Sequence, residues 1–175
     1  MIVTIPLIMY VFIDAVWGLK AGVITAILSM LGIMLFHYLS FNEIDEFLLG
    51  EGVLIIAFGL LSLWFNNSRY FKLQPVVVAM AYILVLLWFE LFSEPLLVKM
   101  IPGMIKIAPD YAQSFTDPHS IAILRRLSIG LIFVFVIHAA VVAWSALRLN
   151  NFAWLLSRLS FYPMVLFAAI VVSQW

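Results

Sequence analysis

The chain is 175 residues long, with 66% hydrophobic residues, 10% charged residues and a mean hydropathy of +1.18. Charged residues make up about a quarter of a soluble domain, so this composition excludes an ordinary soluble domain and predicts an integral membrane protein. Nine basic residues balance nine acidic ones, and cysteine is absent. We therefore expect no nucleic-acid partner, no disulfide and no cysteine-based metal or haem site.

Long apolar stretches predict the helices, because a helix needs about 20 mostly apolar residues to cross roughly 30 Å of hydrocarbon. The first predicted helix, residues 5–19, is short and carries Asp14, so we expect it to cross at a tilt, to re-enter or to lie partly in the interface. No Lys or Arg precedes Lys20, so a cleaved signal peptide is not expected. The other predicted helices span residues 22–41, 47–65, 75–93, 121–147 and 152–174.

Most connections between these helices are short, which favours antiparallel neighbours. The sequence therefore predicts an all-α integral membrane protein, a compact bundle of five to six transmembrane helices that forms a single domain over residues 1–175. The expected helix N-caps are Asn42, with Asp45 three residues later, and Asp117, with Pro118 directly after it.

A polar connector, "NNSRYFKLQP" at residues 66–75, separates two of the apolar stretches. Aromatic residues flank it, as they do in the belts at membrane interfaces. The pattern predicts a turn at the membrane surface over residues 66–74, with Arg69 and Lys72 directed to lipid phosphates.

The longest connection, residues 94–120, is also the most apolar one. Lys99 and Lys106 are seven residues apart, so they share one helical face, while Pro102 and Gly103 divide the segment in two. This pattern predicts a bent amphipathic element in the headgroup plane, with its lysines on phosphates. The alternative is a partly ordered loop packed over the bundle.

The order of several weak motifs carries a family resemblance. "FGLLSLWF", the connector and then "EPLLVKM" follow one another, "IPLIMYVFIDAVWGLKAGVITAI" precedes them, and Trp144, Trp154 and Arg158 lie in the last two predicted helices. In this order and spacing the chain resembles the intracellular septation protein A family of bacterial inner-membrane-spanning proteins. The connection at residues 94–120 is longer and more apolar than the family pattern.

The resemblance implies a multi-pass protein of the bacterial inner membrane with a role in septation, cell shape and envelope integrity. Its implied partners are the lipid bilayer and other inner-membrane proteins, among them the elongation and division machinery. It implies neither an enzyme nor a cofactor. The positions that match the family pattern in the connector are Asn67, Phe71, Lys72 and Pro75.

The residues themselves also predict neither an enzyme nor a metal site. The sequence contains no H-E-x-x-H helix, Walker loop or nucleophile elbow. Paired intramembrane histidines could hold a haem, but single hydrogen bonds inside the bundle are the favoured interpretation of His37, His119 and His138. The acidic residues Glu43, Asp45, Glu46 and Glu51 could bind a hard cation, although a solvated loop with a helix start explains them without one.

Charged residues inside predicted spans are candidates for function, because burying a charge in hydrocarbon costs about 2.5–3.5 kcal/mol on insertion scales. Those close to helix ends can reach the interface: Glu90, Arg125, Arg126 and Arg148. Asp14 and Arg158, in the first and last predicted helices, remain. They could lie at the interface, or they could form an intramembrane polar pair that holds the bundle together or lines a polar cavity.

Three functions stay open at this point. The first is a non-enzymatic membrane scaffold that docks partner proteins, and the second is a small transporter or channel with Asp14, Glu90 and Arg158 along a polar path. The third is an accessory subunit of a larger membrane complex. The basic residues are divided equally between the two sides, so the family resemblance alone decides our expectation that residues 94–126 are cytoplasmic.

Overall fold

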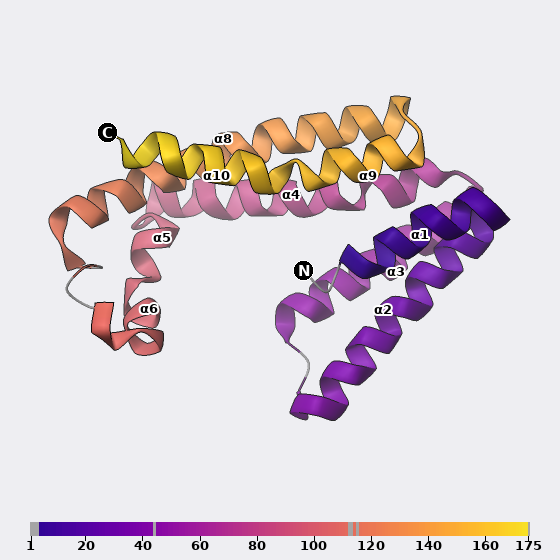
Figure 1. Ribbon diagram of the computed structural model, residues 1–175, viewed down its shortest axis with the longest axis horizontal. Coiled ribbons are helices and arrows are strands. Elements are labelled where there is room, and N and C mark those ends of the chain that lie inside the picture. Colours follow the sequence, from indigo (N-terminus) through magenta and orange to yellow (C-terminus); the bar gives the residue numbers. More distant parts are fainter. Residues whose placement is uncertain (1–3, 44, 112–113, 115, 175) are drawn as a thin grey trace. The chain divides into compact units, whose positions relative to one another are not determined.

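The computed structural model describes residues 4–43, 45–111, 114 and 116–174, and every element formed by these residues is helical (Figure 1). The predicted all-α membrane fold is confirmed. In chain order the helices are α1 (Thr4–Trp17), α2 (Leu19–Phe41), α3 (Glu46–Trp64), α4 (Ser68–Phe92), α5 (Leu96–Lys99), α6 (Ile101–Ile107), the 3-10 helix η1 (Pro109–Tyr111), α8 (Pro118–Arg148), α9 (Asn151–Leu159) and α10 (Phe161–Ser173).

Among the residues that the structure describes, four segments are long and apolar enough to cross a membrane: α2, α4, α8 and the α9–α10 segment Asn151–Ser173. The apolar part of α3, Leu48–Trp64, and α1 are shorter. At a rise of about 1.5 Å per residue, the 14 residues of α1 extend about 21 Å, less than the roughly 30 Å of a hydrocarbon core. This length agrees with the expectation that α1 differs from an upright span.

The chain divides into two compact units. Unit 1 comprises residues 1–76 and 142–158, and unit 2 comprises residues 77–141 and 159–175. Helices α4 and α8 each contribute residues to both units, and the boundary near residue 158 falls at the end of α9. The single domain expected from the sequence stays a prediction.

Two glycines shape the first hairpin of unit 1. Gly18 has φ 82° between α1 and α2, a left-handed conformation that side chains disfavour. Gly22 lies in α2 against α1, and a Cβ atom there would come within 2.8 Å of the Asp14 Cβ and 3.0 Å of the Tyr10 carbonyl oxygen. The lack of a side chain at Gly22 therefore permits the tight packing of these two helices.

The helix ends follow the expected capping chemistry with one correction. The prediction that Asn42 caps the third helix was wrong: Asn42 is the left-handed C-cap of α2, and its N–H donates to the Tyr38 carbonyl over 2.7 Å. Asp45 caps α3 instead, because its Oδ1 accepts the Leu48 N–H at 3.0 Å. The cap at Asp117 is confirmed by the bonds that its Oδ2 accepts from the His119 and Ser120 N–H groups.

The connector is mostly helical, so the predicted surface turn over residues 66–74 was wrong beyond Asn67. Helix α4 starts at Ser68, and the Asn67 Oδ1 accepts the Arg69 N–H over 3.0 Å as a cap does. Pro75, which was expected to open the helix, lies inside it. The long apolar stretch that follows continues α4, and the missing Pro75 N–H leaves one carbonyl of the first turns without its usual donor.

The last predicted helix, 152–174, is two helices. Helix α9 ends at Leu159 and α10 begins at Phe161. Pro163 explains the interruption, because it has no N–H to offer the Leu159 carbonyl and its ring crowds the preceding turn.

Unit 2 contains three long segments in contact, from α4, α8 and α10. Tyr82 of α4 stacks on Phe135 of α8 with ring centroids 5.3 Å apart, and Phe135 also lies 4.9 Å from the ring of Phe161 in α10. No hydrophobic effect drives helices together inside a bilayer, so these segments associate through packing contacts such as these aromatic pairs.

The connection from residue 94 to 120 holds α5, α6 and η1, and part of it lies outside the described residues. Short helices with a bend agree with the expected element, but the bend lies at Met100, and Pro102 and Gly103 are inside α6. Its placement in the headgroup plane stays a prediction. Lys99 lies over the Phe89 ring, with Nζ 4.9 Å from the centroid.

Candidate functional site

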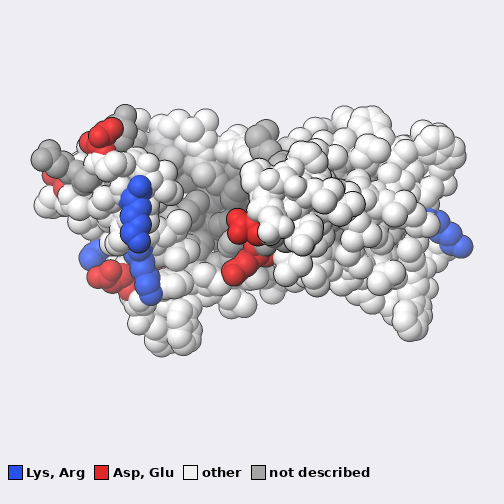
Figure 2. Space-filling model, turned by 90° about the horizontal axis from the view of Figure 1, so that it is seen from below, with Lys and Arg blue, Asp and Glu red and all other residues white. Residues whose placement is uncertain are grey.

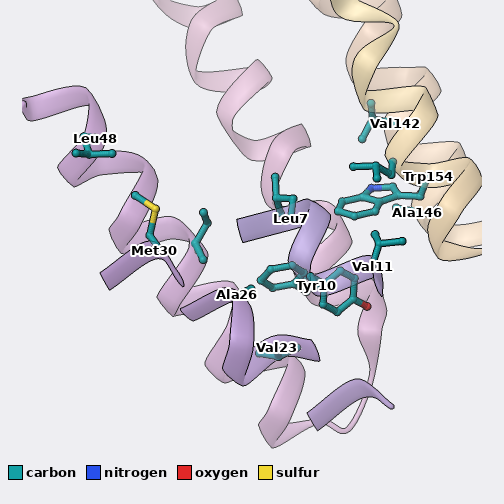
Figure 3. Packing of buried hydrophobic residues seen from close by; sticks show 13 residues of the cluster. Leu7, Tyr10, Val11, Val23, Ala26, Met30, Leu48, Val142, Ala146 and Trp154 are labelled. Carbon is teal, nitrogen blue, oxygen red and sulfur yellow. The ribbon is translucent and has the colours of Figure 1, made fainter. Parts of the chain in front are cut away.

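A group of buried and half-buried polar and aromatic side chains occupies the part of unit 1 where the start of α4 meets α1 and α9. We call it the connector cluster and define it as Tyr10, Asp14, Phe71, Lys72, Asn151 and Trp154. Figure 3 shows Tyr10 and Trp154 as neighbours inside the hydrophobic core of this unit. The cluster therefore joins segments that are far apart in the sequence.

Aromatic rings form the apolar half of the connector cluster. Tyr10, Phe71 and Trp154 are fully buried. The Tyr10 ring lies 4.5 Å from Phe71 and meets Trp154 edge-on at 6.1 Å, with an interplanar angle of 90°. Edge-to-face contact is a favoured geometry for aromatic pairs. The Trp154 Nε1 also donates to the Lys72 carbonyl over 3.0 Å, so one side chain of α9 fixes both α1 and α4.

The Lys72 side chain lies inside the connector cluster. The expectation that it points outward to lipid phosphates was therefore wrong. Its side chain is 5% exposed, and Nζ donates to the Leu149 carbonyl over 3.4 Å, at the end of α8. The Asp14 carboxylate is close enough to attract the ammonium group. A buried charge needs such partners, so Lys72 is an internal link between α4, α1 and the end of α8.

A hydrogen bond joins Asp14 of α1 to Asn151, the first residue of α9. The Asn151 Nδ2 donates to the Asp14 Oδ2. Tyr10 meets Trp154 in the same pair of helices, so the residue numbers of α9 rise as those of α1 fall. Arg158 is seven residues beyond Asn151, about 10 Å further along α9. The register thus places Asn151, rather than Arg158, level with Asp14, and pairing of Asp14 with Arg158 stays a prediction.

A second polar contact joins α3 and α4. The Gln74 Nε2 donates to the Glu51 Oε2 over 3.5 Å, and both side chains are buried. The Gln74 Oε1 is buried as well and has no hydrogen-bond partner among the described residues. In the sequence, Glu51 groups with the acidic residues of the loop before α3. Its position five residues into α3, followed by ten apolar or small residues, was the signal that could have placed it inside.

A serine pair links the end of α8 to α9. The hydroxyl oxygens of Ser145 and Ser157 are 2.6 Å apart, and each also lies within hydrogen-bond reach of a carbonyl three residues earlier in its own helix, those of Val142 and Trp154. Each hydroxyl has one proton, so one serine donates to the other across the helices while the accepting serine donates to the carbonyl of its own helix.

The remaining basic residues expected at the lipid interface are exposed: Arg69, Lys99, Lys106, Arg125 and Arg126. Their contact with lipid stays a prediction. The face seen in Figure 2 is mostly uncharged, with charged side chains confined to a few places. A surface of this kind suits a hydrocarbon environment.

The histidines and acids expected to be structural have individual contacts. The His37 Nδ1 is 3.0 Å from the Glu43 carbonyl oxygen, and the His138 ring, in unit 2, meets the Phe161 ring edge-on at 5.2 Å. His119 lies in the first turn of α8. Glu43 and Glu46 are exposed. Over the described residues, no three His, Asp or Glu side chains gather closely enough to hold a metal ion.

Comparison with known proteins places the chain in a family. A family model described as intracellular septation protein A matches residues 1–174. The chain belongs to the intracellular septation protein A family. The family predicted from the connector and its flanking motifs is thereby confirmed, and with it a multi-pass protein of the inner membrane.

Relatives in this family carry the name inner membrane-spanning protein YciB. The protein of Histophilus somni (strain 2336) is 30% identical over 108 residues, which are 61% of this chain and 60% of that protein. The protein of Buchnera aphidicola subsp. Acyrthosiphon pisum (strain Tuc7) is 30% identical over 80 residues, 45% of each chain. The chain thus spans about half the length of the curated relatives it matches. No solved structure matches it.

The four residues that carry the family resemblance in the connector all act at the start of α4. Asn67 caps the helix, Phe71 packs on Tyr10, and Lys72 reaches the Leu149 carbonyl. Pro75 is buried one turn later and removes a backbone donor there. The pattern thus marks the part of α4 that docks on the other segments of unit 1.

Proposed function

We propose that this septation protein A family member is a non-enzymatic membrane scaffold, which acts in septation and envelope maintenance by docking other inner-membrane proteins on its lipid-facing helices. One observation carries the proposal: three polar contacts inside unit 1 join its own helices to one another. Lys72 contacts Leu149, Asp14 contacts Asn151, and Trp154 contacts Lys72. Groups used in this way fix the helices and leave the outer face for partners.

The outer face offers large aromatic side chains for docking. Phe36 of α2, Trp88 of α4 and Trp144 of α8 are 69%, 61% and 60% exposed. Within a bilayer, helix association depends on packing and on hydrogen bonds between helices, because lipid is as apolar as the side chains. Broad aromatic rings give the large contact area that such packing needs, and this supports a docking role.

Site-specific photocrosslinking in living cells tests the proposal. A photoreactive phenylalanine analogue replaces Phe36, Trp88 or Trp144, and the captured proteins are identified by mass spectrometry. We expect division or elongation proteins to be captured at one or more of these positions. Val142, which is fully buried, is the matched control position and should capture none. If the exposed positions capture only lipid, and cells without the protein divide normally, the scaffold proposal is refuted.

A small transporter is the second candidate, favoured by the buried Glu51–Gln74 contact and its unpaired Gln74 Oε1. An intramembrane carboxylate of this kind is a common part of an ion or proton path. Proteoliposomes separate the two functions. A proton or cation flux that is lost in Glu51→Gln, with Glu94→Gln as the exposed control, would support the transporter. Equal background flux in all three proteins would rule it out.

A further inference from the structure

An apolar groove runs along unit 2 between α8 and α10. The two helices are antiparallel there, since the His138 ring meets that of Phe161, whereas a Cβ atom on Gly130 would lie 3.9 Å from Val172. The groove has a volume of about 430 Å³. Ligand pockets in proteins span roughly 300–1,000 Å³, so the groove is large enough to hold a ligand or part of one.

Hydrophobic residues, one glycine and one proline line the groove. Phe133 and Ile137 form its wall on α8, Phe167 and Val171 form the wall on α10, and Gly130 opens the end near Val172. Phe133 and Phe167 remain largely exposed, at 65% and 69%. The groove is therefore open to the surrounding medium, and its occupant must be apolar.

One basic residue continues the groove toward the start of α8. Arg126 is one turn before Gly130, and at about 100° per residue it lies on the same helical face as Gly130, Phe133 and Ile137. Arg125 faces well away from this stripe, although it is equally basic and also exposed. The groove thus has a positive charge at one end and hydrocarbon along the remainder.

The length of this arrangement matches one leaflet of a bilayer. Arg126 and Ile137 are eleven residues apart, which is about 16 Å along the helix. Half of a hydrocarbon core is about 15 Å. With the Arg126 guanidinium at the headgroup level, the far end of the groove lies near the bilayer midplane.

The charge and the length of the groove favour a lipid as its occupant. The basic side chain of Arg126 at one end suits a phosphate, and the apolar remainder suits an acyl chain about one leaflet long. We propose that the α8–α10 groove binds one acyl chain of an anionic phospholipid, whose phosphate contacts Arg126. This lipid site is separate from the docking role proposed above and does not depend on it.

Photoreactive lipids test the site in the full-length protein. The protein is reconstituted in phosphatidylcholine vesicles that contain a small fraction of phosphatidylglycerol with a diazirine in one acyl chain, and labelled peptides are mapped by mass spectrometry. We expect labels to concentrate on residues 130–137 and 163–172. Arg126→Gln should lower this labelling about fivefold relative to the other helices, the equivalent of about 1 kcal/mol for one basic contact. Arg126→Lys should retain most of it.

Matched variants separate the groove from general lipid contact. Arg125→Gln removes the same charge one residue away and should leave the share of labels in the groove unchanged. Gly130→Leu should fill the groove and remove labelling there, whereas Gly32→Leu, at an open position on α2, should not. Labels spread evenly over all lipid-facing helices, or equal losses in the two arginine variants, would overturn the proposal.

Discussion

Trp154 gives the sharpest test of the connector cluster, because it contacts α1 and α4 at once. Replacing a buried Trp with Ala costs about 3–5 kcal/mol in a protein core. Trp154 is fully buried, its ring meets Tyr10, and its Nε1 donates to the Lys72 carbonyl. In a bilayer the unfolded reference state is also apolar, so the loss comes from packing and hydrogen bonding rather than from transfer to water. We therefore expect Trp154→Ala to cost about 3 kcal/mol, the lower end of the range.

The free energy of unfolding can be measured by titrating the protein with SDS in mixed micelles and following helicity by circular dichroism. Trp144→Ala is the matched control, since Trp144 is also in unit 1 but 60% exposed, and it should change the free energy by about 0.5 kcal/mol or less. Trp154→Phe keeps an aromatic ring and removes the N–H donor, so it should cost about 1 kcal/mol. Equal, small effects of the two alanine variants would show that Trp154 does not hold unit 1 together.

Three further experiments probe polar contacts of unit 1. Lys72→Met keeps most of the side-chain volume and should cost less than Lys72→Glu, which puts a second negative charge beside Asp14 and should cost about 3–5 kcal/mol in the same SDS titration. Equal costs would mean that Lys72 reaches solvent. Asn67→Ala removes the cap of α4 and should cost about 1 kcal/mol, with Asn67→Ser as the variant that restores it; no difference between the two would contradict the cap. Asp14→Asn and Asn151→Ala should be strongly non-additive, whereas Asp14→Asn and Arg158→Gln should add within about 0.5 kcal/mol. Non-additivity in the second pair would favour the direct ion pair instead.

Most of the helices could be predicted from the sequence because the bilayer imposes a simple rule. Backbone groups in hydrocarbon must bond within their own helix, so each long apolar stretch becomes a helix of nearly the same extent. The stretch predicted as 22–41 became Leu19–Phe41, and that predicted as 121–147 became Pro118–Arg148. At most of these helix ends the errors are between one and three residues, because caps such as Asp45 decide where a helix stops and composition gives little guidance there.

The prediction for the start of α4 was wrong because polar residues in a connector are normally expected to be exposed to solvent. Lys72 and Gln74 lie in a polar run, and Pro75 is typical of a first helical turn. The structure buries all three of these residues, together with Phe71 and Ala79, on the inner side of one helix. The helical spacing of Phe71, Pro75 and Ala79 was present in the sequence, but the polar residues between them concealed it.

The partners of these polar groups could not be predicted, because each contact crosses a long stretch of chain. Lys72 meets Leu149 across 77 residues, and Asn151 meets Asp14 across 137. Apolar side chains pack about as well against lipid as against another helix, so an apolar helix alone does not select its neighbour. A buried amine, amide or carboxylate does select, because leaving it unpaired in hydrocarbon is costly. This requirement gives a physical reason why the recognisable family pattern lies in the polar connector. The apolar stretches need only be apolar, whereas Phe71 and Lys72 must meet particular partners, Tyr10 and the Leu149 carbonyl, for α4 to dock.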